Sequence, residues 1–148
     1  MTYEINDQTP GRPGCDGNDR RGQVIVLELP YPPSVNRYWR SAVIGGRVAV
    51  YINKEGRAYR ALTAETVASL PSSESKAPEG RLSVLVSLYP PDRRRRDLDN
   101  TSKALLDALT HAGVYEDDDL IDRLTIERCA VTKGGKVRVC ITELRETA

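Results

Sequence analysis

Five segments of the chain carry the apolar patterns of β-strands, and their spacing predicts one small sheet. They are residues 24–29, 48–52, 81–88, 120–131 and 136–144. The first is almost continuously apolar, which favours a strand in the centre of the sheet, whereas 81–88 alternates as a half-buried strand does. Residues 132–135, with two glycines, predict a hairpin turn between the last two strands. Residues 35–47 lack a regular pattern and predict a loop.

Two further segments have the apolar spacing of amphipathic helices. The first runs from 54 to 70 with Asn53 as its N-cap, and a linker rich in Ser, Pro and Glu follows at 71–80. The second runs from about 100 to 112, and Gly113 follows it as the C′ residue that terminates many helices. Its core-facing positions are Thr101, Leu105, Ala108, Leu109 and Ala112. The order β(β)αβαββ predicts an α+β protein, a single small domain with a mixed sheet and two helices.

Composition changes this picture only at the N-terminus. The 148 residues suit one domain, but residues 1–22 are rich in Gly and charged side chains and poor in apolar ones. We therefore expect a flexible N-terminal tail at 1–22 and a folded domain at 23–148. Apolar runs are too short for a transmembrane helix, and no signal peptide is recognisable. Three cysteines without C-x-x-C spacing predict reduced thiols, and the expected location is the cytoplasm.

Charge is balanced overall but clustered locally. The chain has 22 basic and 21 acidic side chains, which excludes a uniformly basic coat for nucleic acid. The main cluster is at residues 91–100, where Arg93–Arg96 are followed at once by Asp97 and Asp99. In an extended segment, residues i and i+2 point the same way, so the two carboxylates can converge while Leu98 turns toward the core. Ionised carboxylates at the start of a helix predict a site for a hard cation such as Mg²⁺.

The second predicted helix adds a lysine to this acidic centre. Lys103 lies one turn beyond Asp99, opposite the core stripe, where it can form an i,i+4 ion pair or stabilise charge on a reacting phosphate. Asp107 is expected to orient Lys103. His111 is expected to interact favourably with the helix dipole at the C-terminus of the helix. A second acidic cluster follows the helix: Glu116, Asp117, Asp118, Asp119 and Asp122. By itself such a cluster is a solvated turn, but a loop that returns toward Asp99 would supply a third carboxylate ligand.

Basic and aromatic side chains surround the predicted acidic centre. The arginine run is either a basic surface loop or an attractant for an anionic substrate, and Trp39 either stacks on unpaired bases or packs against the sheet. The candidate DNA-binding residues are Asn36, Arg37, Trp39, Arg40, Arg93, Arg94, Arg95, Arg96 and Lys133. An acidic centre with a basic surround is typical of metal-dependent phosphodiester chemistry.

Taken in order, these motifs resemble the RusA family of Holliday-junction resolvases. The resemblance spans about residues 24–144 and includes the ordered motifs LPYPPSVNRYWR, EGRAYR, PDRRRRDLDN, AGVYEDD and VTKGG. It implies a homodimer that cleaves four-way DNA junctions with Mg²⁺ or Mn²⁺. It also implies that Asp97, Asp99 and Asp118 bind the metal and that Lys103 is catalytic. The family commonly has two aspartates after the second helix where this chain has three, so Asp117 and Asp119 remain alternatives to Asp118.

The sequence thus predicts a Mg²⁺-dependent endodeoxyribonuclease that resolves Holliday junctions by paired nicks in recombination and repair. Branched DNA and a second copy of the chain are the expected partners, without a membrane or a small-molecule cofactor. One alternative is a non-catalytic DNA-junction-binding protein that uses the same basic surface, and another is a metal-binding regulatory domain. The complete set of three aspartates and Lys103 favours the enzyme, because binding alone does not require it.

Overall fold

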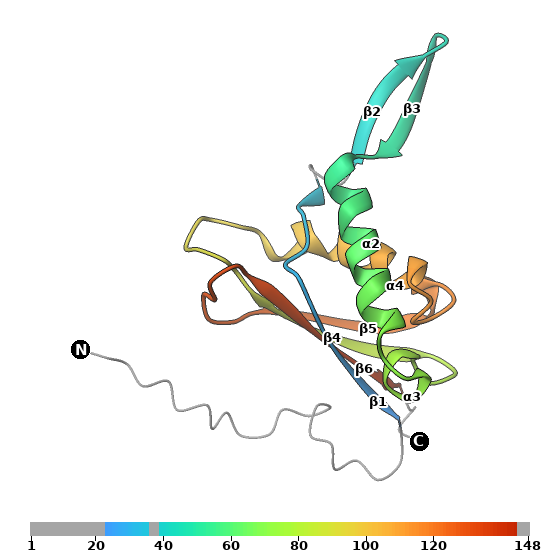
Figure 1. The fold of residues 1–148 in the computed structure, drawn as a ribbon, viewed down its shortest axis with the longest axis vertical. Helices are drawn as coiled ribbons and strands as arrows, with labels where there is room; N and C mark the ends of the chain where they lie inside the picture. The colour runs from blue at the N-terminus through green and yellow to red at the C-terminus, as the bar shows by residue number, and fades with distance from the viewer. Residues whose placement is uncertain (1–22, 36–38, 145–148) are drawn as a thin grey trace, which may run out of the picture.

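The computed structural model describes residues 23–35 and 39–144, so the predictions for residues 1–22, Asn36 and Arg37 lie outside it. Its strands and helices confirm the α+β prediction, with the helices packed over one face of a mixed four-stranded sheet (Figure 1). The strands are β1 (Val24–Leu29), β4 (Leu82–Tyr89), β5 (Ile121–Arg128) and β6 (Lys136–Glu143). Their spatial order is β1–β6–β4–β5, with β4 and β5 parallel and the other pairs antiparallel.

Strand β1 lies at one edge of the sheet, so the prediction of a central strand was wrong. Ile25, Leu27 and Leu29 are buried, whereas Val26 and Glu28 are exposed. Only one face of this strand is covered, and Val26 extends the apolar run without entering the core. An apolar run of this length therefore does not distinguish a central strand from an edge strand with one exposed valine.

Strands β5 and β6 do not form a hairpin, which corrects the second strand prediction. Strand β4 lies between them, and the chain from residue 129 to 135 passes the end of β4. The predicted turn exists: Gly134 and Gly135 have φ values of 82° and 70°, and the Gly135 N–H donates to the Thr132 carbonyl at 2.8 Å. A Cβ at Gly135 would lie 2.9 Å from Tyr31 Cβ, so this close approach requires glycine.

A second, two-stranded sheet replaces part of the predicted loop at 35–47. Strand β2 (Trp39–Ile44) pairs antiparallel with β3 (Arg47–Ile52), which confirms the strand predicted at 48–52 and extends it by one residue. Gly45 and Gly46 connect the strands with φ values of 58° and 78°, as a tight two-residue hairpin turn requires. We call residues 39–52 the arm, because the hairpin projects away from the rest of the molecule in Figure 1.

The helices follow the predicted signals closely. Helix α2 (Lys54–Ala68) ends two residues early and is capped by Asn53, whose side-chain oxygen accepts the Gly56 N–H at 2.8 Å. The predicted linker contains a short helix, α3 (Ser72–Ser75). The second predicted helix begins with a 3-10 turn, η1 (Leu98–Thr101), which leads directly into α4 (Ser102–His111). A last 3-10 turn, η2 (Asp118–Leu120), precedes β5.

The core lies between the sheet and helices α2 and α4. It is built almost entirely from Val, Leu and Ile, and four of the five predicted core-facing positions of η1 and α4 are buried. Two buried tyrosines have their hydroxyl groups hydrogen-bonded to backbone carbonyls. The Tyr59 hydroxyl donates to the Pro30 carbonyl at 2.9 Å, and the Tyr115 hydroxyl donates to the Leu106 carbonyl at 3.0 Å. None of the helices in the described ranges has the length and apolar character needed to cross a bilayer.

Candidate active site and nucleic-acid interface

Asp97 and Asp99 lie at the start of η1, where the second helix begins. Asp97 is extended, but Asp99 is inside the 3-10 turn, so the prediction that both belong to one extended segment was wrong. The exposure pattern nevertheless alternates as expected, with both aspartates exposed and Leu98 packed against the core. Neither carboxylate has a hydrogen-bond or ion-pair partner among the described residues, and Asp97 does not cap η1 with its side chain.

The four arginines before this pair do not act alike. The Arg96 guanidinium donates to Asp92 Oδ1 at 2.6 Å and lies over the Tyr31 ring, 5.9 Å from its centroid. The hydrogen bond from Arg96, joined by one from the Arg94 backbone N–H, lowers the pKa of Asp92 to about 2. The Arg96 side chain is 25% exposed, against 84% for Arg94. Arg96 therefore holds the loop in shape, while its neighbours face solvent.

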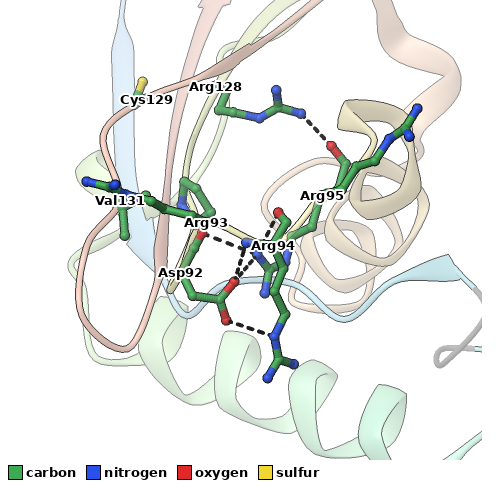
Figure 2. A pocket seen from close by; sticks show the side chains of 9 residues that line it. Asp92, Arg93, Arg94, Arg95, Arg128, Cys129 and Val131 are labelled. Atoms are coloured by element: carbon green, nitrogen blue, oxygen red, sulfur yellow. Dashed lines mark hydrogen bonds and ion pairs between the residues drawn. The ribbon is translucent and has the colours of Figure 1, made fainter.

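A hollow of about 310 Å³ lies beside this loop (Figure 2). It is lined by Pro90, Asp92, Arg93, Arg94, Arg95, Arg96, Arg128, Cys129 and Val131. Arg128, which the sequence analysis did not single out, donates to the Arg96 carbonyl from the end of β5. Arg93 and Arg95 have no ion pair or hydrogen bond within the described part of the chain, so their guanidinium groups are available to an anion. Cys129 is half-buried and its thiol is free.

Helix α4 carries Lys103 on its exposed side, as predicted, and Asp107 one turn later. Asp107 Oδ2 lies 3.4 Å from Arg60 Nε of α2, a contact that joins the two helices. Arg60 belongs to the EGRAYR motif, but its spacing from Asp107 in the sequence gave no sign of the contact. The orientation of Lys103 by Asp107 stays a prediction.

The acidic turn after α4 gives its three aspartates different surroundings. Asp117 caps η2 by accepting the Asp119 N–H at 3.1 Å, and this bond contributes most to lowering its pKa. Asp119 is 89% exposed and lies 4.0 Å from Arg81, which also pairs with Asp122. Asp118 is half-buried, and its hydrogen bond with Asp117, followed by burial, raises its pKa.

Lys103 and the acidic turn come together in space. The positive charge of Lys103 lowers the pKa of both Asp117 and Asp118, although in Asp118 the opposing effects are larger. Burial raises the pKa of Tyr115, and the negative charges of Asp118 and Asp107 add to the effect. The loop after α4 therefore folds back toward Lys103, and its predicted return to Asp99 stays a prediction.

Among the described residues, no third carboxylate lies close enough to Asp97 and Asp99 to complete a metal site. Within residues 23–35 and 39–144, no three His, Cys, Asp or Glu side chains lie close enough together to hold a metal ion. The donors do fit a hard cation in chemical type: Asp97 and Asp99 offer carboxylates without a partner in the described part of the chain, and Asp118 lies against a like charge that a cation would relieve. The metal-binding assignment of Asp97, Asp99 and Asp118 stays a prediction.

The other predicted DNA contacts are spread over three regions. Lys133 is exposed in the turn at 132–135. Trp39 and Arg40 begin β2, and their contact with DNA stays a prediction. Asn36 and Arg37 fall outside the described residues.

Comparison with known proteins identifies the family. The profile of the family described as "Endodeoxyribonuclease RusA" matches residues 30–142. This chain belongs to the RusA family. It is 40% identical over 118 residues to the "Crossover junction endodeoxyribonuclease RusA" of Escherichia coli O139:H28, covering 80% of this chain and 93% of that protein. Proteins of the same description from Enterobacteria phages HK97 and 82 are 40% and 39% identical, with 92% and 93% of their lengths covered.

The match extends over all the site elements of this RusA-family chain. Residues 30–142 include the arm, the arginine loop, η1, α4, the acidic turn and the turn at 132–135. The N-terminal residues 1–22 lie outside it, as the sequence analysis expected.

The structure divides the arginine run into two functions that mutation can separate. Replacing Arg93, Arg94 and Arg95 with Ala should weaken DNA binding strongly and reduce its salt dependence, because up to three phosphate contacts are lost. The Tm should change little, because these side chains are exposed.

Arg96→Ala should instead lower the Tm, because it removes the hydrogen bonds to Asp92 and the contact with Tyr31. Fluorescence anisotropy across a salt series, together with thermal melts, measures both. A triple variant with unchanged salt dependence would contradict the division.

Among the three aspartates of the acidic turn, Asp118→Asn should impair cleavage most. Asp117 is exposed and caps η2, and Asp119 is exposed and faces Arg81, whereas Asp118 is half-buried and, like Asp117, feels the charge of Lys103. Single-turnover cleavage by the three single Asn variants gives the ranking. Equal losses, or a loss only in Asp119→Asn, would show that the register assumed here is shifted by one residue.

Proposed function

We propose that this protein is a structure-selective endodeoxyribonuclease that resolves four-way DNA junctions in recombination and repair. The observation that carries the proposal is the arrangement around one helix. Asp97 and Asp99 have no partner among the described residues and lie at the start of the turn that leads into α4. Lys103 lies in the first turn of α4, and the acidic turn returns to that lysine. The printed names of the relatives, crossover junction endodeoxyribonucleases, support the same reaction.

The proposed mechanism gives each of these side chains one role. Asp97, Asp99 and Asp118 would hold one or two divalent cations. When bound, Mg²⁺ or Mn²⁺ supplies Lewis-acid polarisation of the scissile phosphate and a more acidic water. Lys103 stabilises the negative charge that develops on the phosphate oxygens or the leaving oxygen, and its exposed position on α4 leaves it open to substrate.

The basic surface beside the site would position the substrate. Arg93, Arg94 and Arg95 contact phosphates, and Arg96 keeps their loop in place through Asp92 and Tyr31. Asn36, Arg37, Trp39, Arg40 and Lys133 are proposed to extend this surface. Because the chain as a whole has a net charge of only +1, the affinity for DNA depends on this local cluster.

A second copy of the chain is part of the proposal because of the symmetry of the substrate. Resolution of a four-way junction into two duplexes needs two nicks on opposed strands. A dimer with two-fold symmetry presents two identical sites to those strands. The relatives come from Escherichia coli and from Enterobacteria phages, so the cytoplasm, where such DNA lies, is the proposed location.

The test is cleavage of a mobile four-way junction compared with a linear duplex of the same sequence, with and without Mg²⁺. Denaturing gels should show paired nicks in the junction that require the metal, and no cut in the duplex. Asp97→Asn, purified in the same way, controls for a contaminating nuclease. Tight junction binding without cleavage in Mg²⁺ or Mn²⁺ would instead favour the non-catalytic junction-binding protein.

A further inference from the structure

The arm carries the most exposed large apolar side chains of the described residues. The four most exposed large apolar side chains of the described chain all lie in it: Val43 and Val48 at 72%, Ile44 and Val50 at 65%. A two-stranded hairpin by itself is only marginally stable in water, and contiguous exposed apolar side chains mark a contact surface. These exposed side chains make the tip of the arm a candidate contact surface.

The tip of the arm combines apolar and basic side chains. Val43 pairs with Val48 on one face, and Ile44 pairs with Arg47 on the other, on either side of the Gly45–Gly46 turn. Residues 39–52 contain two arginines and no acidic residue, whereas the whole chain has 21 acidic residues. This charge complements a polyanion.

The shape of the arm also suits nucleic acid. A two-stranded β-ribbon fits into a DNA groove, and apolar side chains at a ribbon tip can wedge between base pairs. In a continuous duplex the wedge must first break stacking, which costs free energy. At the crossover of a four-way junction the stacking is already interrupted, so insertion there is favoured.

We propose that the arm is the element that selects junctions, with Val43, Ile44 and Val48 inserted against base faces at the open centre. Arg47 contacts a neighbouring phosphate. This proposal rests on the proposed function, because it takes four-way DNA as the substrate. In this proposal, apolar contacts at the tip provide the preference for junctions over duplex DNA, and the arginines provide the affinity for DNA in general. A purely basic surface could not be mutated to change one property without the other.

A second copy of the chain explains the arm less well. Residues 39–52 contain two arginines and no acidic residue, so two arms packed against each other would bring like charges together without a compensating carboxylate.

The test replaces Val43 and Ile44 together with Thr, which keeps the β-branched side chain that strands favour but removes apolar surface. Leu124→Thr is the matched control, since Leu124 is an exposed apolar residue of β5, away from the arm. Dissociation constants are measured in Ca²⁺ for a four-way junction and for a linear duplex of the same sequence. A 2-aminopurine at the crossover reports unstacking by its fluorescence.

We expect V43T/I44T to weaken junction binding about tenfold or more, to leave duplex binding within about twofold, and to abolish the 2-aminopurine signal. Arg47→Gln should weaken both complexes and lower the salt dependence by about one phosphate contact. An unchanged junction preference in V43T/I44T would overturn the proposed role of the arm but not the proposed function. A shift of V43T/I44T from dimer to monomer in sedimentation would overturn it in favour of a second copy. A wild-type protein without junction preference would refute the proposed function itself.

Discussion

Replacing Asp97 or Asp99 with Asn should abolish junction cleavage while junction binding survives. Each change removes one carboxylate charge that has no partner among the described residues, so the fold loses no contact of that side chain. Binding should persist or tighten slightly, because the arginine loop is intact and a negative charge next to the DNA phosphates is removed. Cleavage in Mg²⁺ and gel-shift affinity in Ca²⁺ measure the two properties separately.

Calorimetry gives this prediction a readout that does not depend on activity. Titration of Mn²⁺ should give a binding isotherm with the wild-type protein and a much weaker one with either Asn variant. Glu65→Gln, which removes an exposed carboxylate from α2, is the matched control and should behave as wild type. Nicking at the wild-type rate by Asp97→Asn or Asp99→Asn would contradict the metal-site assignment.

Lys103→Ala should slow cleavage by roughly 10²–10³-fold, the range for loss of one preorganised group that stabilises a transition state. Lys103 is exposed on α4, so its removal should hardly change the Tm. Junction affinity should fall only slightly, because one phosphate contact among many carries a small share of the salt-dependent free energy. The measurement is single-turnover cleavage at saturating protein, with gel-shift affinity in Ca²⁺.

Two variants sharpen the interpretation of Lys103. Lys103→Arg keeps the positive charge and should restore part of the rate if charge is what matters. Lys76→Ala removes an exposed lysine after α3 and should leave the rate unchanged. A Lys103→Ala protein that binds poorly but cleaves at the normal rate once saturated would make Lys103 a docking residue.

The sequence by itself determined the parts of the molecule that depend on near neighbours in the chain. Asn53 caps α2 and Gly113 follows α4 with a positive φ, because these signals act within one helical turn. Asp97, Asp99 and Lys103 were placed at the start of a helix for the same reason. The apolar spacing of α4 identified the buried face that leaves Lys103 in solvent.

Only the tertiary structure decided which strands are neighbours. Strand β4 lies between β5 and β6, and β1 is at an edge, because ladder hydrogen bonds join backbone groups that nearly every residue has. An apolar pattern shows which face of a strand is buried, not what pairs with its edges. The hairpin predicted at 132–135 failed for this reason.

The tertiary structure also decided which members of a uniform charge run are free. Four adjacent arginines read alike in the sequence, but Asp92 and Tyr31 engage Arg96 and leave Arg93 and Arg95 to solvent. Similarly, Asp118 differs from its neighbours because Asp117 caps a turn and Asp119 faces Arg81, which is 38 residues away in the chain. The contacts with Tyr31 and Arg81 join distant segments, and no local pattern encodes them.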